Sequence, residues 1–287
     1  MLSNTNVDSD WDWQIKDKTS WWGASLFEIW LYRHLILGLV RRDFLLSYQQ
    51  TILGPLWVLL QPLMVLITYV LVFGKLVGIS TQGTPPVLFY LAGIILWNLF
   101  NDSFTSTSSI FRDNAHIFSK VYFPRLVMPL AQLSAQLLRF VIQLLLLLLL
   151  TGYYWVFTKW PVPTALQLVL ALVVVIFTAA LSLALGLIFS VLTGKYRDVA
   201  YVVSLGVRLL MFLTPVIYPI SYVAEKWRWI VELNPLTPLF ELFRFCLLNN
   251  GTVTTGQVLY SGIVTILLLT MALLLFNKTG DKLIDVI

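Results

Sequence analysis

The sequence predicts an all-α membrane protein with six transmembrane helices and an amphipathic helix at the membrane surface before them. Of its 287 residues, 59% are hydrophobic and only 11% are charged, whereas soluble domains are about 45–50% apolar and about 25% charged. Apolar runs long enough to cross a roughly 30 Å hydrocarbon core occur six times. The basic residues lie mainly between these runs, so membrane topology explains the net charge of +5 better than nucleic-acid binding does.

The first 55 residues form two predicted segments on the cytoplasmic side. Residues 1–25 are polar, acidic and rich in Trp, without the apolar core of a signal peptide, so we expect a cytoplasmic N-terminal extension. Residues 26–55 are expected to form an interface helix that ends at the Leu-Gly-Pro break at 53–55. At helical spacing, its apolar residues share one arc: Leu26, Trp30, Leu37, Phe44 and Tyr48.

Six spans are predicted within residues 56–276, which form one transmembrane domain. They lie near 56–74, 87–104, 130–151, 166–192, 199–219 and 258–276. An even number of spans places both termini on one side. Twelve of the nineteen Lys and Arg residues then lie on that side and five on the other, which identifies the side of the termini as the cytoplasm. Residues 277–287 are the expected cytoplasmic tail.

The segment before the last span, 219–257, is apolar and aromatic although it is too short for a further span. Asn234-Pro235 and Pro238 divide it into two short helical pieces. Re-entrant or interfacial helices explain this pattern best, and an ordinary extracytoplasmic loop is the alternative.

Polar residues occur inside two predicted spans at helical spacing. Gln132, Gln136, Arg139 and Gln143 share one face of the third span, and Tyr201, Ser204 and Arg208 share one face of the fifth. A membrane Arg must face protein or water because its insertion costs about 2.5–3.5 kcal/mol. These faces could line a hydrated path or bond neighbouring helices. We expect Arg208 to line a path and Arg139 to join helices, with Asn98, Asn101 and Asp102 as possible counter-groups.

No catalytic or cofactor site is expected in the chain. The spans hold no pair of carboxylates for a proton relay, and the two His residues, His34 and His116, have no nucleophile or acid beside them. Gly194-Lys195 is followed by Tyr196, which does not fit a phosphate-binding loop. With Cys246 as the single Cys, a Cys-based metal site is excluded.

Several motifs, in order along the chain, resemble ABC-2 type permeases. They are RRDF at 41–44, YQQTILGPLW at 48–57, QP at 61–62, FSKVYFPR at 118–125, YRDV at 196–199, TPVIY at 214–218 and NPLTP at 234–238. They are most similar to the branch that exports O-antigen, capsular or teichoic-acid-like polysaccharides. The family's additional basic residue around 47–49 is absent, and residues 1–25 are outside the common pattern.

The resemblance implies a complex in the bacterial inner membrane. Two copies of the permease would pair with two ATP-hydrolysing subunits, which would bind the ATP and Mg, and the cargo would be a polysaccharide on undecaprenyl pyrophosphate. Residues around 110–124 would form a cytoplasmic gate and coupling loop. Contacts to the ATPase or to lipid phosphates are expected from Arg33, Arg41, Arg42, Arg112 and Lys120. The extracytoplasmic gate would include Trp227, Trp229, Phe240 and Phe243.

A sugar-polymer channel needs aromatic faces for pyranose rings and scattered hydrogen-bonding groups. The expected lining residues are Tyr69, Phe73, Tyr201, Arg208 and Phe212; the alternative for the aromatic residues is an interfacial belt. Three other functions stay open: an ABC-2 permease for drugs or small lipids, a membrane glycosyltransferase or polymerase, and a secondary transporter. The enzyme would need converging acidic residues and the secondary transporter inverted repeats, and neither pattern is visible.

Overall fold

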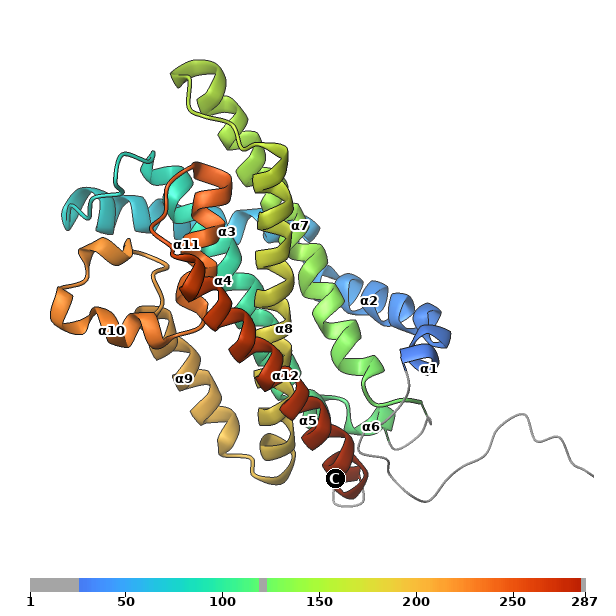
Figure 1. Cartoon of the computed structure of the whole chain (residues 1–287). Coiled ribbons are helices and arrows are strands. Elements are labelled where there is room, and N and C mark those ends of the chain that lie inside the picture. Colours follow the sequence, from blue (N-terminus) through green and yellow to red (C-terminus); the bar gives the residue numbers. More distant parts are fainter. Residues whose placement is uncertain (1–25, 119–122, 285–287) are drawn as a thin grey trace, which may run out of the picture.

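The computed structural model describes residues 26–118 and 123–284, and these residues are helical or irregular, without a strand (Figure 1). Five helices in this part are long and apolar enough to cross a membrane: Gly54–Leu76, Pro86–Ser108, Val127–Thr158, Ala165–Lys195 and Thr255–Thr279. A shorter apolar helix, Val199–Leu213, lies between the fourth and fifth. The predicted all-α, multi-span fold is thus confirmed. Within the predicted fifth span of 199–219, the regular helix ends after 15 residues.

Four long helices form an upright bundle: α4 (Pro86–Ser108), α7 (Val127–Thr158), α8 (Ala165–Lys195) and α12 (Thr255–Ile284). α8 packs along both α4 and α12. Gly186 of α8 permits the close approach to α4, because a Cβ there would lie 2.5 Å from Cβ of Thr107. α4 is mostly buried although it contains several polar residues, so it is the central helix of the described chain.

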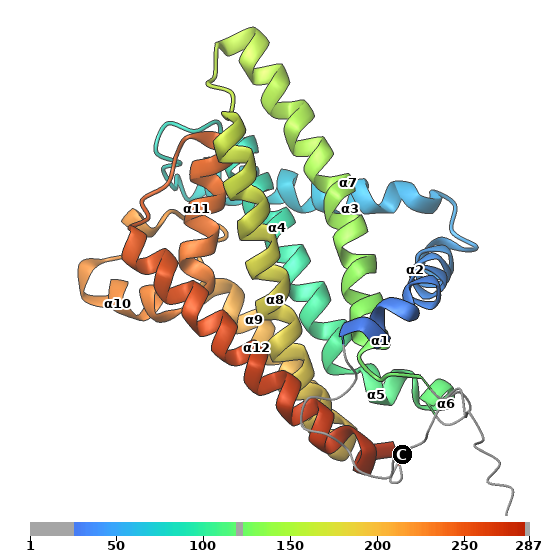
Figure 2. The ribbon, with the colours of Figure 1, turned by 45° about the vertical axis from the view of Figure 1, so that its right-hand side comes forward.

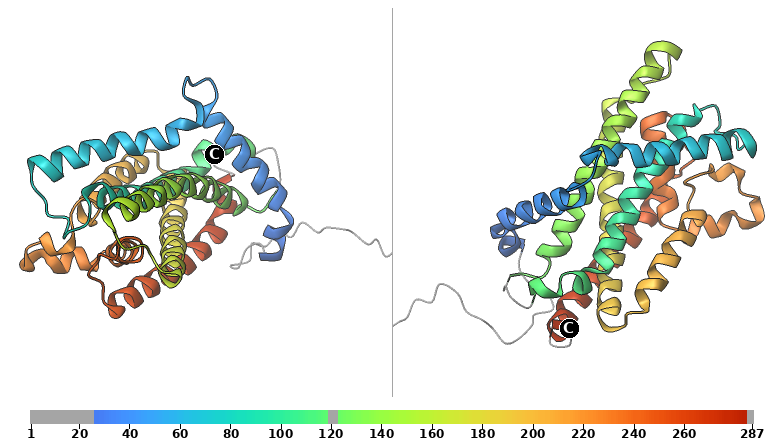
Figure 3. Two further views of the ribbon diagram at one scale, coloured as in Figure 1. Left: turned by 90° about the horizontal axis from the view of Figure 1, so that it is seen from above. Right: turned by 180° about the vertical axis from the view of Figure 1, so that it is seen from behind.

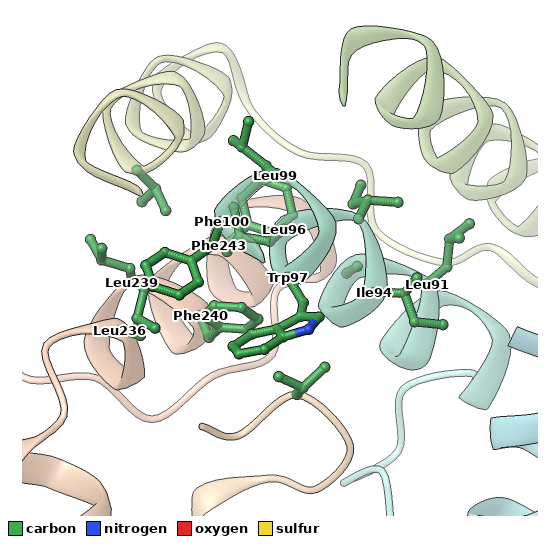
Figure 4. Packing of buried hydrophobic residues seen from close by; sticks show 14 of the residues in the cluster. Leu91, Ile94, Leu96, Trp97, Leu99, Phe100, Leu236, Leu239, Phe240 and Phe243 are labelled. Carbon is green, nitrogen blue, oxygen red and sulfur yellow. The ribbon is translucent and has the colours of Figure 1, made fainter. Parts of the chain in front are cut away.

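Two short helices precede the last span, α10 (Glu225–Leu233) and α11 (Leu236–Leu248). α11 packs against α8 and α4, and α10 packs against α11. The Asn234 side chain fixes the turn between them. Its Nδ2 donates to Oγ1 of Thr214, the residue after α9 (Val199–Leu213), and its Oδ1 accepts from the Leu236 N–H at the start of α11. Figure 4 shows rings of α11 packed against rings of α4 at the centre of the core. The segment 219–257 therefore contains the two short helices that its prolines predict.

The N-terminal region forms two helices, α1 (Leu26–Leu31) and α2 (Arg33–Tyr48), rather than one helix to residue 55. The chain leaves the helix at Gln49 and passes through left-handed backbone at Gln50 (φ 60°) and at Gly54 (φ 54°). The helix ends earlier than predicted because a residue with positive φ cannot continue a right-handed helix. This turn begins at Gln50, before the Leu-Gly-Pro sequence.

The first apolar segment continues as η1 (Gly54–Leu56), α3 (Trp57–Tyr69) and the π-helical turn η2 (Val70–Leu76). Figures 2 and 3 show that it crosses the upright helices instead of running parallel to them. It contacts α4 and α7, and only 17% of its most apolar stretch is buried. Most of its apolar surface is therefore without a protein partner in the single chain.

The connections alternate between the two ends of the bundle (Figures 1 and 2). The links at 77–85, 159–164 and 249–254 lie at one end. The other end holds α5 (Ile110–Asp113), α6 (Ala115–Phe118), the turn between α8 and α9, and the C-terminal end of α12. From α4 to α12 the chain therefore passes back and forth in the predicted order of spans, whereas the first apolar segment crosses these helices. The assignment of each end to a side of the membrane stays a prediction.

Candidate functional site

The polar face of α7 meets the interface helix α2, and this joint is the candidate functional site. Gln132 Nε2 of α7 donates to Oδ2 of Asp43 on α2 at 2.9 Å. Asp43 also pairs with its neighbour Arg42, whose Nη2 lies 2.8 Å from Oδ1. The Asp43 carboxylate is thus compensated by a cation on its own helix and bonded to an amide on α7.

Arg139 makes the second link between the same helices. Its Nη2 donates to Ser47 Oγ at 2.8 Å and its Nη1 donates to Gln136 Oε1 at 3.1 Å. Its guanidinium also lies over the Tyr48 ring, 5.7 Å from the centroid. These contacts confirm the helix-joining role expected of Arg139.

A polar cavity of about 350 Å³ lies between α2 and α7. Its wall combines both charges of the joint with amide, hydroxyl and apolar groups. The lining residues are Asp43, Leu46, Ser47, Gln132, Ala135, Gln136 and Arg139. The cavity is open to the surroundings and is lined by the residues that connect the interface helix to the bundle.

The polar face extends up α7 into the bundle. Gln143 Nε2 donates to the Val58 carbonyl at 3.2 Å, and its Oε1 accepts from Asn98 Nδ2 at 3.4 Å. Gln143 thus connects α3, α7 and α4. Asp102, considered as a counter-charge, bonds to Asn101 at 2.7 Å and acts on Arg139 only over a longer distance.

The apolar contact of α2 uses a different face from the predicted one. Leu39 is buried in a hydrophobic cluster that includes Phe111 and Phe276, with Ile36 and Val40 packed beside it. In contrast, Trp30 and Leu37 of the predicted stripe are exposed. An apolar surface without a partner in the chain is available for membrane or for another subunit.

The predicted basic contact residues occupy different settings. Arg33 is exposed and stacks 5.4 Å from the Trp30 ring, and Arg41 is exposed on α2. Arg42 pairs with Asp43, as described above. Arg112 belongs to α5 and pairs with Asp113 at 2.9 Å. Lys120 lies outside the described residues.

The predicted lining residues fall into two groups in the single chain. Tyr69 and Phe73 pack edge to face at 5.5 Å, and the Tyr69 hydroxyl lies 3.9 Å from Sδ of Met211 on α9. Tyr201, Arg208 and Phe212 are exposed on α9. The contact of Tyr69 with Met211 brings the first group next to α9, which carries the second group.

The predicted extracytoplasmic gate residues also divide. Trp227 and Trp229 are exposed on α10. Phe240 and Phe243 are buried on the face of α11 that packs against α4 (Figure 4). The ring centroid of Phe243 also lies 6.3 Å from that of Phe140 on α7. Burial at helical spacing gives Phe240 and Phe243 a packing role in this conformation.

One buried charge pair was not predicted. Glu241 and Arg244 on α11 are 3% and 2% exposed, with Oε1 and Nη1 3.6 Å apart. Arg244 Nη2 donates to the Val216 carbonyl at 2.7 Å, and its guanidinium lies 3.9 Å from the Phe89 ring centroid. The sequence signal that could have located this pair is a Glu and an Arg three residues apart on an otherwise apolar helix.

The sequence is similar to those of known membrane transport proteins. The sequence model described as ABC-2 type transporter matches residues 34–248. An O-antigen export system permease protein RfbA of Klebsiella pneumoniae is 30% identical over 260 residues, which cover 88% of this chain and 95% of the relative. A protein of the same name from Myxococcus xanthus is 28% identical over 257 residues, covering 89% and 96%.

A further relative carries a different cargo in its name. The polysialic acid transport protein KpsM of Escherichia coli is 25% identical over 235 residues, covering 81% of this chain and 88% of the relative. The matched region contains the joint of α2 with α7, the central helix α4 and the two short helices α10 and α11. This multi-pass membrane protein therefore belongs to the ABC-2 type transporter family, as a membrane subunit.

Proposed function

We propose that the chain is the permease subunit of an ATP-driven exporter that moves a lipid-linked polysaccharide across the bacterial inner membrane. Its partners would be a second copy of itself and two ABC ATPase subunits, which bind the ATP and Mg. The cargo would be O-antigen-like and linked to undecaprenyl pyrophosphate. The relatives are named for the transport of polysaccharides, and their similarity to this chain extends over most of both sequences. These names support a polysaccharide as the cargo.

The observation that carries this proposal is the joint between α2 and the bundle. A subunit that performs no hydrolysis itself must receive work through a mechanical contact. α2 bonds to α7 through Asp43–Gln132 and Ser47–Arg139, and α7 bonds onward to α4 through Gln143. A displacement of α2 by a docked ATPase would therefore be passed to the central helix through hydrogen bonds and packed side chains.

The exposed groups on α2 suit the same role. Trp30, Leu37, Leu45 and Leu46 are apolar and exposed, while Arg33 and Arg41 are basic and exposed. Long basic side chains beside apolar ones can reach phosphates or acidic side chains while their stems stay on apolar surface. We assign the α2 end of the bundle to the cytoplasm, together with both termini, because the basic residues are concentrated on that side.

A capsule-type polysaccharide is the second candidate cargo, because the polysialic acid transport protein is among the relatives. Family membership alone also accommodates teichoic acid, a drug or a lipid. These cargoes can be separated by the polymer that accumulates inside cells when the chain is deleted.

The experiment is co-purification combined with export. The chain is co-expressed with a candidate ABC ATPase subunit, and the double variant Arg41→Glu/Arg42→Glu is compared with Lys226→Glu/Arg228→Glu, a matched charge reversal on α10. We expect the α2 variant to lose the ATPase and surface polysaccharide, and the α10 variant to retain the ATPase. Export that continues without any ATPase would refute the proposal.

The lining residues are tested separately. Tyr69→Ala, Phe73→Ala and Phe212→Ala are measured for polymer export at equal permease abundance. We expect each to slow export because an aromatic face for a pyranose ring is lost. Unchanged export in all three would exclude them from the path.

A further inference from the structure

We propose that the cavity between α2 and α7 is a binding site for the phosphate of a membrane amphiphile. The site is distinct from the expected polymer path along α3 and α9. It involves Arg139, which the sequence alone assigns only to helix contact. The cavity of about 350 Å³ is large enough for a phosphate group and its ester oxygens, and its wall holds a cation with unused donors.

The donors that point to an anion belong to Arg139 and Gln136. Each terminal nitrogen of Arg139 carries two N–H groups and uses one of them, Nη1 on Gln136 and Nη2 on Ser47, so one N–H of each nitrogen is unused. Gln136 accepts from Arg139 through Oε1, and no described contact uses its Nε2. A phosphate oxygen accepts from both a guanidinium and an amide, and bonds of this kind to a charged group are among the strongest in proteins.

The charge balance of the cavity also favours an anion. Asp43 lines the cavity, but Arg42 pairs with its Oδ1 and Gln132 donates to its Oδ2. Arg139 has no carboxylate within ion-pair distance among the described residues, because Asp102 acts on it only from further away. The three groups Arg42, Asp43 and Arg139 therefore leave one positive charge uncompensated at the cavity.

The surroundings of the cavity indicate that the phosphate carries an apolar tail. Leu46 lines the cavity and is exposed, as is its neighbour Leu45. A headgroup in the cavity would place hydrocarbon chains along Leu45 and Leu46, whereas free phosphate would leave these side chains without a partner.

The experiment measures lipid binding by the full-length chain and does not depend on transport. Purified protein is titrated with phosphatidylglycerol, with undecaprenyl phosphate and with inorganic phosphate, and the bound molecules are counted by native mass spectrometry. Arg139→Gln and Gln136→Leu are compared with Arg139→Lys and with Arg197→Gln, which removes an exposed Arg on the α8–α9 turn. Gel filtration selects the variants that remain folded.

We expect Arg139→Gln to bind the lipid about tenfold more weakly, Gln136→Leu to show a smaller loss, and Arg197→Gln to bind as the wild type does. Arg139→Lys should recover part of the affinity. Preference for the diacyl lipid would identify a resident phospholipid, and preference for the polyprenyl phosphate would identify the cargo's own lipid. Equal binding by wild type and Arg139→Gln, or an equal loss in Arg197→Gln, would overturn the site. Because no export is measured, this result stands apart from that of the proposed function.

Discussion

The two members of the buried pair Glu241–Arg244 should each be costly to remove singly, because the remaining charge would stay buried without its counter-ion. Both side chains are almost completely buried, and their closest oxygen and nitrogen are 3.6 Å apart. Glu241 Oε2 accepts from the Thr252 N–H at 3.0 Å, and Arg244 Nη2 donates to the Val216 carbonyl at 2.7 Å. The pair thus connects α11 to the chain on both sides of the α10–α11 segment.

The cost of single substitutions follows from uncompensated charge. Removing one partner of a buried ion pair costs about 3–5 kcal/mol, because the remaining charge stays out of water without a counter-ion. Arg244→Met should lie at the upper end, since it also loses the Val216 bond and the contact with the Phe89 ring. The double variant Glu241→Gln/Arg244→Met leaves no net charge, and it should cost less than the sum of the single variants by about 2–3 kcal/mol.

The assay is a double-mutant cycle in detergent, with the free energy of unfolding measured by denaturant titration. The exposed pair Arg112–Asp113, at 2.9 Å, is the control. Asp113→Asn should cost less than about 1 kcal/mol because solvent screens exposed charges. Strictly additive effects of Glu241→Gln and Arg244→Met, or a cost as small as that of the control, would refute this reasoning.

Three further substitutions test other contacts. Gly186→Ala should destabilise the α4–α8 contact by about 1–3 kcal/mol, because the new methyl would overlap the Thr107 side chain. The control Gly206→Ala, with open space at its Cβ, should be neutral or stabilising. Equal thermal stability of the two variants would contradict the close α4–α8 packing. Asn250→Ala should cost about 1–2 kcal/mol and speed hydrogen exchange in the 81–84 loop, which accepts bonds from its amide; unchanged exchange there would contradict this. Gln143→Leu should uncouple α3 from α7 and lower ATP-driven export while ATPase binding persists, and full export would show that this contact is dispensable.

Much of the fold can be predicted from the sequence because the bilayer imposes a length and a polarity on each span. The α8–α9 turn lies between Lys195 and Val199, in the charged segment that separates the predicted fourth and fifth spans. Asn234 and the prolines near it predict two short helices, and the structure contains them as α10 and α11. Local rules sufficed for these elements since backbone groups in apolar surroundings must be satisfied within a helix.

The joint of α2 with α7 was only partly predictable. The spacing of Gln132, Gln136, Arg139 and Gln143 identifies one polar face of α7. It does not identify the partner of that face. Asp43 and Ser47 lie 89 and 92 residues away in the chain from the groups they bond. A contact over such a distance depends on how the helices pack, which no local pattern records.

The gate and lining residues show the same limit. An aromatic residue can face lipid, sugar or protein with equal local chemistry. The structure buries Phe240 and Phe243 against α4 and leaves Tyr201 and Phe212 exposed on α9. Their roles in transport stay predictions, because the contacts described belong to the single chain.

The sequence by itself determined the all-α class, the apolar segments, the charged turn between α8 and α9, and a polar face on α7. Only the tertiary structure decided that this face bonds to α2 around a polar cavity, that α3 crosses the bundle, and that Glu241 and Arg244 are buried together. The physical reason is the range of the forces involved. Helix formation and membrane partition act on consecutive residues, whereas pairing of buried polar groups depends on which distant helix supplies the partner.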